Sequence, residues 1–193
     1  MLVLSTDNPH KLKEIREILG ADEILSKSQY GAPEGEIVED APTLEGNAKI
    51  KVAAIPLKDP GDIIIGDDTG LFVDALDGRP GVHTARFAGE GATDGENRAR
   101  LLEELQGVED RRAHFKTVIA IAHGGGIHFV TGICRGTIAT EERGERGFGY
   151  DSLFIPEGYD KTFAELPAQV KNTISHRARA MGELKSYLEE RGE

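Results

Sequence analysis

Apolar residues along this chain occur either in short continuous runs or at every third or fourth position. The apolar start, MLVLS, predicts a strand. Apolar residues at helical spacing follow, between Asn8-Pro9 and Gly20, and predict a helix with ordinary start and stop signals. A second helix is predicted at about 44–55, because Pro56 ends the pattern.

The rest of the chain also predicts both strands and helices. The run III at 63–65 predicts a buried strand, and two aspartates follow shortly after it. The stretch TDGENRARLLEEL, with Thr93 and Glu96 at capping-box spacing, predicts an amphipathic helix. Residues 113–138 predict two or three antiparallel strands, and about 175–190 a final helix. This order favours an α/β fold whose sheet has an antiparallel part.

Composition narrows the class of protein. With 193 residues and 38% hydrophobic content, the chain suits one globular domain, or one domain in two lobes. The formal net charge of -11 argues against a nucleic-acid partner, since binding to a phosphate backbone needs clustered Lys and Arg. Apolar runs fall far short of the roughly 20 residues of a membrane span, so no membrane association is expected.

Two further features indicate a cytoplasmic protein. The amino terminus has no basic segment followed by a long apolar one, so no signal peptide is predicted. The single cysteine, Cys134, excludes an internal disulfide and a cysteine-based zinc site. Because it lies in the strand-like TGICRGTI, we expect it in the core rather than acting as a nucleophile.

Asp67 and Asp68 pose a chemical problem at what the pattern predicts is a strand end. Adjacent carboxylates repel each other and are costly to desolvate. A bound cation, a shared proton or plain solvent exposure would each resolve this, and Asp followed by Thr-Gly is also ordinary turn chemistry. The pair alone does not choose among these.

The stretch STDNPHK carries a candidate anion site. Asn8 and Pro9 are the expected residues at the start of a helix, where free backbone N–H groups attract anions. His10 and Lys11 lie in the first turn, where the helix dipole disfavours cations unless an anion binds. The alternative is a capped helix with a solvated lysine. The glycine-rich P-loop pattern is absent.

Two more stretches have candidate chemistry. Residues 166–182 contain no Asp or Glu but carry Lys171, His176, Arg177 and Arg179, which suit phosphate oxygens or keto groups; a basic helix start that balances acidic neighbours is the alternative. In GERGFGYDSLF, Phe148 between two glycines offers a flat face for a nucleotide base, although an aromatic residue in a core turn is the commoner case.

Five segments together resemble a known family. TDNPHK, VEDAPTLEGNAKIKVAA, GDDTGLFVDALDGRPGVHTARFAG, GFGYDSLFIPEG and KNTISHRARA occur in the order seen in the inosine triphosphate pyrophosphatase, or Ham1-like, family. The resemblance extends from Thr6 to about Leu188. It implies a single Ham1-like domain over residues 1–193, with a two-lobed mixed-sheet α/β fold, a substrate cleft between the lobes and a homodimer. It also implies Mg²⁺-dependent hydrolysis of ITP, dITP and XTP to the monophosphate and pyrophosphate.

The resemblance also assigns roles to residues. The phosphate-binding turn would comprise Thr6, Asp7, Asn8, Pro9, His10 and Lys11, and Thr69 would touch substrate. Purine and phosphate contacts would come from Phe148, Gly149, Tyr150, Asp151, Lys171, His176 and Arg177. Asp68 and Lys51 would be catalytic. Asp68 and Glu39 would bind the metal, with Glu45 as the alternative to Glu39.

These assignments answer the carboxylate question in chemical terms. Mg²⁺ prefers hard oxygen ligands, and its charge would offset the repulsion within the pair. Asp68 would act as general base, although water activation by the metal stays open, and Lys11 and Lys51 would stabilise the departing pyrophosphate. A donor from His176, Arg177 or a backbone N–H would accept the purine six-keto group and reject ATP; how GTP is rejected is not indicated.

Two other functions remain to be distinguished by experiment. A Maf-like pyrophosphatase acting on other modified nucleotides would prefer dUTP, dTTP or methylated nucleotides. An inactive nucleotide-binding protein would be expected to lack the carboxylate pair or the lysines, and this chain has them all.

Overall fold

The computed structural model describes residues 1–20, 23–33, 35 and 37–191. Its strands are β1 (Leu2–Leu4), β2 (Leu25–Ser26), β3 (Ile63–Val73), β4 (Pro80–Gly81), β5 (Arg112–His123), β6 (Gly126–Ile138) and β7 (Phe154–Pro156). They form a 7-stranded sheet in the order β2-β1-β3-β5-β6-β7, with β4 paired to β3. β1 is parallel to β2 and β3, whereas β4 and β7 are antiparallel to their neighbours. The predicted mixed α/β class is therefore confirmed.

The helices are α1 (Pro9–Leu19), α2 (Leu44–Ala53), α3 (Asp94–Glu104), α4 (Ala168–Ile174) and α5 (His176–Arg191), with 3-10 turns at Asp74–Leu76 and Thr84–Arg86. The predicted caps are present. The Asn8 side chain accepts from the first turn of α1, Gly20 ends that helix in a left-handed conformation, and both halves of the Thr93–Glu96 capping box form. None of the helices in the described part of the chain is long and apolar enough to cross a membrane.

Two predictions of secondary structure need correction. β3 does not stop at the aspartates but runs on to Val73, so Asp67 and Asp68 lie inside a strand. Asp and Gly are poor strand residues, but burial and pairing with neighbouring strands override that preference. The helix α4, which was not predicted, precedes α5 with Ser175 between them. The prediction of two or three strands within residues 113–138 is confirmed, because β5 and β6 lie there, joined at Gly124–Gly125.

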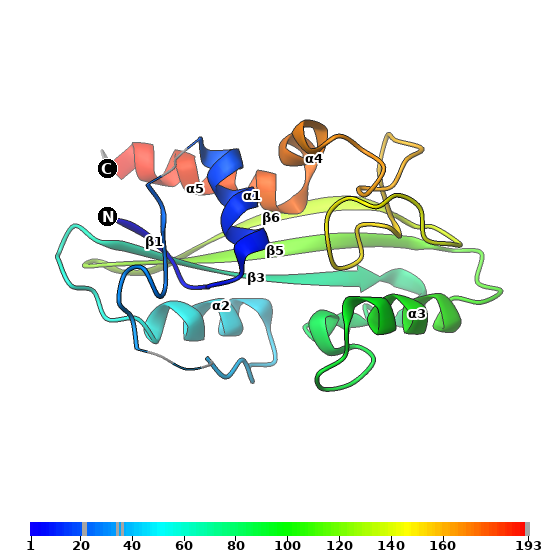
Figure 1. The fold of residues 1–193 in the computed structure, drawn as a ribbon, viewed down its shortest axis with the longest axis horizontal. Helices are drawn as coiled ribbons and strands as arrows, with labels where there is room; N and C mark the ends of the chain where they lie inside the picture. Colours follow the sequence, from blue (N-terminus) through cyan, green and yellow to red (C-terminus); the bar gives the residue numbers. More distant parts are fainter. Residues whose placement is uncertain (21–22, 34, 36, 192–193) are drawn as a thin grey trace. The chain divides into compact units, whose positions relative to one another are not determined.

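Contacts within the chain divide it into two compact units. Unit 1 comprises Met1–Asp68, Thr117–Gly132 and Arg177–Glu193, and unit 2 comprises Thr69–Lys116 and Ile133–His176. Each unit has its own apolar cluster. In unit 1 it is formed by Leu4, Ile15, Ile24, Ile65, Ile119, Ile121, Ala180, Met181 and Leu184. Within this unit α1 and α5 cover one face of the strands and α2 covers the other (Figure 1).

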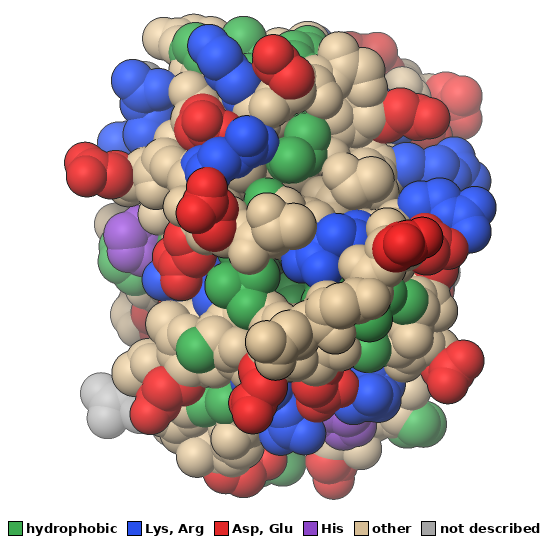
Figure 2. Space-filling model, turned by 90° about the vertical axis from the view of Figure 1, so that its right-hand side faces the viewer, with side chains coloured by type: hydrophobic (Ala, Val, Ile, Leu, Met, Phe, Trp, Pro, Cys, Tyr) green, Lys and Arg blue, Asp and Glu red, His purple; other side chains and the backbone are tan. Residues whose placement is uncertain are grey.

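The cluster of unit 2 joins α3 to the strands and to the segments that follow them. It includes Leu71, Leu101, Leu105, Phe115, Cys134, Tyr150, Phe154 and Phe163. The prediction that Cys134 is a core residue is confirmed, since it is 2% exposed. On the face drawn in Figure 2, acidic and basic side chains are interspersed around small apolar groups, so neither sign of charge dominates that face.

Candidate functional site

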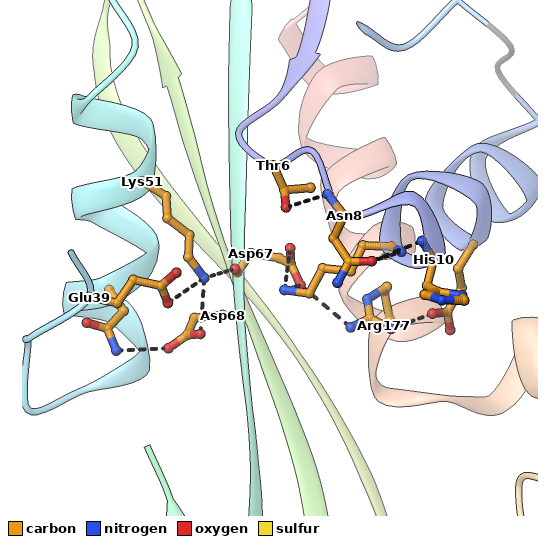
Figure 3. A network of polar contacts seen from close by, with 11 residues as sticks. Thr6, Asn8, His10, Glu39, Lys51, Asp67, Asp68 and Arg177 are labelled. Atoms are coloured by element: carbon orange, nitrogen blue, oxygen red, sulfur yellow. Dashed lines mark hydrogen bonds and ion pairs between the residues drawn. The ribbon is translucent and has the colours of Figure 1, made fainter. Parts of the chain in front are cut away.

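Asp67 and Asp68 point to opposite sides of β3 (Figure 3). Successive side chains of a strand alternate between its two faces, so continuing the strand through the pair separates the carboxylates. Both are buried, with Asp67 3% and Asp68 9% exposed. Each therefore needs its own compensating partners, and the structure supplies a different set on each side.

Asp68 belongs to a cluster centred on Lys51 of α2. The Lys51 ammonium lies 3.2 Å from Asp68 Oδ1 and 2.8 Å from Glu39 Oε2, and it donates to the Asp67 main-chain carbonyl at 2.7 Å. The second oxygen of Asp68 accepts from Asn47 Nδ2 at 3.1 Å. One ammonium thus gathers two carboxylates, and Asn47 fixes the orientation of one of them.

Asp67 is paired with cations on the other side of the strand. Lys11 Nζ lies 3.1 Å from Asp67 Oδ2, and Arg177 Nη2 lies 3.6 Å from the same oxygen. Arg177 Nη1 also forms a 2.5 Å ion pair with Glu14 of α1. Because Arg177 is 3% exposed, this network of two carboxylates and two cations is largely shielded from water.

The surroundings shift the pKa values of the two aspartates in opposite directions. For Asp67, burial opposes ionisation, but the charges of Lys11, Arg177 and Lys51 outweigh it and hold the pKa below its ordinary value. For Asp68, burial raises the pKa and the charge of Glu39 adds to this, against the opposing effects of Lys51 and Asn47. Asp68 is thus the carboxyl that binds a proton more readily, as a general base requires.

The two lysines also differ. Burial lowers the pKa of Lys11, and the neighbouring charges of Lys51 and Arg177 lower it further, while Asp67 opposes them. Burial would lower the pKa of Lys51 too, but Asp67, Asp68 and Glu39 outweigh it and raise the pKa above its ordinary value. Lys51 is therefore the more firmly charged of the two.

Close packing of α2 against β3 brings Lys51 to the strand. A Cβ added to Gly66 would lie 2.9 Å from Lys51 Cβ and 3.1 Å from the Ala48 carbonyl, so only glycine permits this approach. Ser5 Oγ donates to the Lys51 carbonyl at 2.6 Å and ties the helix to β1. The Thr43 side chain caps the helix start. The sequence pattern predicted α2 but not this contact.

The start of α1 does not offer the free N–H groups that were predicted. Asn8 Oδ1 accepts from the backbone N–H groups of His10 and Lys11 at 2.9 and 3.3 Å, and Asn8 N–H donates to Thr6 Oγ1 at 3.2 Å. Pro9 has no N–H. The N-cap side chain thus satisfies the donors that an anion would otherwise meet. The positive charge at this turn comes instead from the Lys11 ammonium.

Asp7 is turned toward another segment of the same unit. Its carboxylate accepts from the Ser28 backbone N–H at 2.9 Å and lies 3.7 Å from Lys27 Nζ. Burial opposes ionisation, but the hydrogen bonds from Ser28 and the charge of Lys27 lower the pKa of Asp7. A direct contact of Asp7 with a phosphate therefore stays a prediction, as does the contact predicted for Thr69, which follows Asp68 in β3.

Unit 2 holds a second cluster, formed by predicted site residues around Asp151. Its Oδ2 accepts from the Phe148 N–H at 3.0 Å and lies 2.7 Å from Lys171 Nζ. The same ammonium lies 5.1 Å from the centre of the Phe148 ring, a distance at which a cation is attracted to an aromatic face. Phe148 and Asp151 from one motif and Lys171 from another thus meet in space.

Two other predicted residues of unit 2 lie deeper. The Tyr150 hydroxyl donates to the Thr84 carbonyl at 2.8 Å, its ring is part of the core, and burial raises its pKa. The His176 ring stacks on Phe115 with centroids 4.4 Å apart and is 4% exposed. The structure therefore shows both side chains supporting the unit internally, and their contact with a ligand remains a prediction.

Sequence reasoning missed Glu14 and Asn47. Glu14 is a buried carboxylate on the apolar face of α1, beside Ile15, and an acidic residue at such a position indicates a buried partner. Asn47 is 2% exposed, and it joins Asp68 to the Ala41 N–H as well. The Asn47 amide within the apolar pattern of α2 also indicates a buried partner, but less strongly than the Glu14 carboxylate, because an amide is uncharged.

The residues present fit a divalent metal ion. Glu39 and Asp68 both supply hard oxygens beside the Lys51 ammonium, and the charge of Glu39 raises the pKa of Asp68, as expected for neighbouring carboxylates. Among the described residues, no three His, Cys, Asp or Glu side chains are grouped so as to hold an ion. This donor set suits Mg²⁺, which usually takes one or two carboxylates and completes its shell with substrate phosphates and water.

The fold and this site define a mixed α/β protein with buried carboxylates and lysines gathered on the two sides of β3. The Ham1 family model matches residues 2–187, and the chain belongs to the Ham1 family. It is 49% identical over 189 residues to a dITP/XTP pyrophosphatase of Porphyromonas gingivalis, covering 97% of this chain and 96% of that protein. A dITP/XTP pyrophosphatase of Desulfotalea psychrophila is 50% identical over 189 residues, covering 96% of this chain and 84% of that protein.

Solved structures agree with this assignment. The Staphylococcus aureus Ham1 protein superposes with a TM-score of 0.85 at 35% identity, covering 98% of each chain. The mixed sheet is therefore the fold of the family as well as of this chain.

Proposed function

We propose that this protein hydrolyses ITP, dITP and XTP to the nucleoside monophosphate and pyrophosphate, and so clears these purines from the nucleotide pool. The observation that carries the proposal is the Lys51 ammonium, which holds the carboxylates of Glu39 and Asp68 together beside β3. Membership of the Ham1 family supports it, as do the names of the curated relatives.

In the proposed reaction, a water oxygen attacks the α-phosphorus, and the bond from that phosphorus to the bridging oxygen breaks to release pyrophosphate. The Asp68 carboxylate takes a proton from the water, for which its raised pKa is suited. Lys51 and Lys11 place positive charge where the leaving group develops negative charge. Asn47 keeps Asp68 in one orientation through its 3.1 Å hydrogen bond.

Glu39 and Asp68 are the residues that would hold Mg²⁺. When bound, the ion supplies positive charge that offsets the charge of the triphosphate and of the two carboxylates. Glu39 and Asp68 both pair with the Lys51 ammonium, and this proximity to Asp68 favours Glu39 over Glu45 as the second metal ligand.

Recognition of the base is proposed to rest on Phe148, Lys171 and His176, with Arg177 as a further donor. Phe148 would stack on the purine, and a donor from His176, Arg177 or a backbone N–H would pair with its six-keto group. Arg177 is already paired with Glu14, but a guanidinium has five N–H donors, so pairing does not exhaust it. A purine with an amino group there would leave the donor unpaired, so we expect ATP to be rejected.

Other features of the proposal follow from the family resemblance. We propose that the chain is a single Ham1-like domain whose two lobes bind the nucleotide in a cleft, that it works as a homodimer and that it is cytoplasmic. Light scattering of the purified protein tests the dimer.

The first experiment is pyrophosphate release from ITP, dITP, XTP, ATP and GTP at one concentration, first with Mg²⁺ and then with EDTA. A second panel holds dUTP, dTTP and methylated nucleotides. Turnover that EDTA abolishes, and that is confined to the first three substrates, is the expected result. Preference for the second panel would replace the proposal with a Maf-like activity, and inactivity on every substrate would leave a binding protein.

A further inference from the structure

Helix α3 forms hydrogen bonds to both main-chain polar groups of Gly149, the residue that follows Phe148. The Gly149 N–H donates to Asp94 Oδ2 at 2.8 Å, and the Gly149 carbonyl accepts from Arg98 Nη1 at 2.8 Å. Both partners are charged, and charge-assisted hydrogen bonds are stronger than neutral ones. Asp94 and Arg98 are four residues apart, which places them on the same face of the helix.

The helix that carries this pair is firmly anchored within unit 2. Leu101 and Leu105 lie in the core, and the capping box fixes the first turn. Asn97 accepts from the Ala88 N–H at 2.7 Å and donates to the Ala85 carbonyl at 3.0 Å. The two charged side chains therefore project from a rigid support.

The turn that they hold passes through a glycine. Gly149 has a φ of 61°, in the left-handed region, and a Cβ there would meet nothing within 4 Å. Glycine at this position allows the left-handed conformation, and it has no side chain that could fix the turn by packing. The Phe148 N–H is held by Asp151 on one side, so the bonds to Gly149 complete the restraint on the other.

We infer that Asp94 and Arg98 are positioning residues that fix the Phe148 ring for stacking on the purine. This inference rests on the proposed function. The pair acts through Gly149. By restraining the Phe148 segment in the free protein, it reduces the conformational entropy that this segment would otherwise lose when the base binds. The triphosphate groups of the substrate have no part in this effect. Loss of the pair should therefore weaken binding of ligands that contain the base and leave binding of a bare phosphate chain unchanged.

The test compares Asp94→Ala, Arg98→Ala and the double variant with the wild-type protein. We expect the KM for ITP to rise roughly 3- to 10-fold in each single variant, with kcat changed less than about 2-fold. Inorganic tripolyphosphate, which has no base, serves as a competitive probe, and its inhibition constant should stay unchanged. Arg98→Lys should restore part of the loss, because it keeps a donor for the carbonyl.

Matched controls come from the same helix. Arg100 also donates to a main-chain carbonyl, that of Phe87, at 2.7 Å, and it pairs with Glu104. Arg100→Ala therefore removes an equivalent arginine without touching Gly149. Glu96→Gln removes a charge from the first turn, as Asp94→Ala does. Glu142→Gln tests the other contact of Arg98, a 3.0 Å ion pair. All three controls should keep the wild-type KM.

Hydrogen exchange provides a readout that does not depend on turnover. Exchange of the amides of residues 148–151, followed by mass spectrometry, should speed up in Asp94→Ala and Arg98→Ala but not in Arg100→Ala. If Asp94→Ala and Arg98→Ala are active and keep the wild-type exchange and the wild-type KM, the inference is overturned and the proposed function still stands. Equal weakening of ITP and tripolyphosphate would also overturn it. A wild-type protein inactive on ITP would instead overturn the proposed function, and the inference with it.

Discussion

Asp67 and Asp68 are neighbours in the chain, but their carboxylates lie on opposite sides of β3 and pair with different lysines, Lys11 and Lys51. The repulsion that the sequence suggested is thereby reduced by strand geometry and by a separate cationic partner for each carboxylate. Asp67 is neutralised within the protein, whereas Asp68 shares its lysine with Glu39. This division of roles leads to the predictions below.

Replacing Asp68 with Asn should reduce kcat for ITP by about 10²- to 10⁴-fold, because the amide cannot accept the proton. The fold should survive, since the amide can still accept from Asn47. Steady-state kinetics and thermal unfolding measure the two effects. A near-wild-type kcat would remove Asp68 from the chemistry.

Replacing Glu39 with Gln should raise the Mg²⁺ concentration needed for half-maximal activity roughly 10-fold, since one charged oxygen ligand is lost. Glu45→Gln is the matched control, because Glu45 lies in the first turn of α2. Titration of activity against Mg²⁺ at fixed ITP measures both. If only the Glu45 variant shifted, the two residues would have to exchange roles.

Lys11→Ala should weaken binding of ITP roughly 10-fold or more while leaving binding of inosine unchanged, because only the triphosphate gains from the ammonium. Lys13→Ala is the control, since Lys13 lies in the same helix with its side chain 78% exposed. Calorimetry with each ligand measures the difference. Equal losses for ITP and inosine would argue against a phosphate contact.

Asp62 should make the stability of the protein depend on acid pH. A hydrogen bond from the Tyr30 hydroxyl, aided by the amino terminus and against the effect of burial, lowers the pKa of Asp62 to about 2. The unfolded value is about 3.9, so the stabilisation is complete above roughly pH 4 and is lost as the pH falls through about 2.

Urea unfolding of the wild type and of Asp62→Asn between pH 6 and pH 2 measures this. The difference in unfolding free energy should shrink toward zero as the pH falls. Asp59→Asn removes a nearby exposed charge and keeps the backbone N–H that Asp62 accepts, so it should show no such trend. A difference that stayed constant with pH would contradict the assignment.

Local signals in the sequence determined the parts of the fold that depend on neighbours in the chain. Asn8, Gly20 and the Thr93–Glu96 pair mark helix ends through hydrogen bonds that reach only a few residues, and the structure contains all of them. Five motifs in register also sufficed to identify the Ham1 family. In both cases the information lies within short stretches of sequence.

Tertiary structure alone decided the features that depend on distant partners. β3 continues through Asp67 and Asp68 as a strand that lies between β1 and β5 in the sheet, against local preference. The pairing of Glu14 with Arg177 joins residues 163 positions apart, and that of Asp94 and Arg98 with Gly149 joins α3 to a later loop. Such contacts depend on packing in three dimensions, so charge and burial in the sequence indicate that a partner exists without indicating which residue it is.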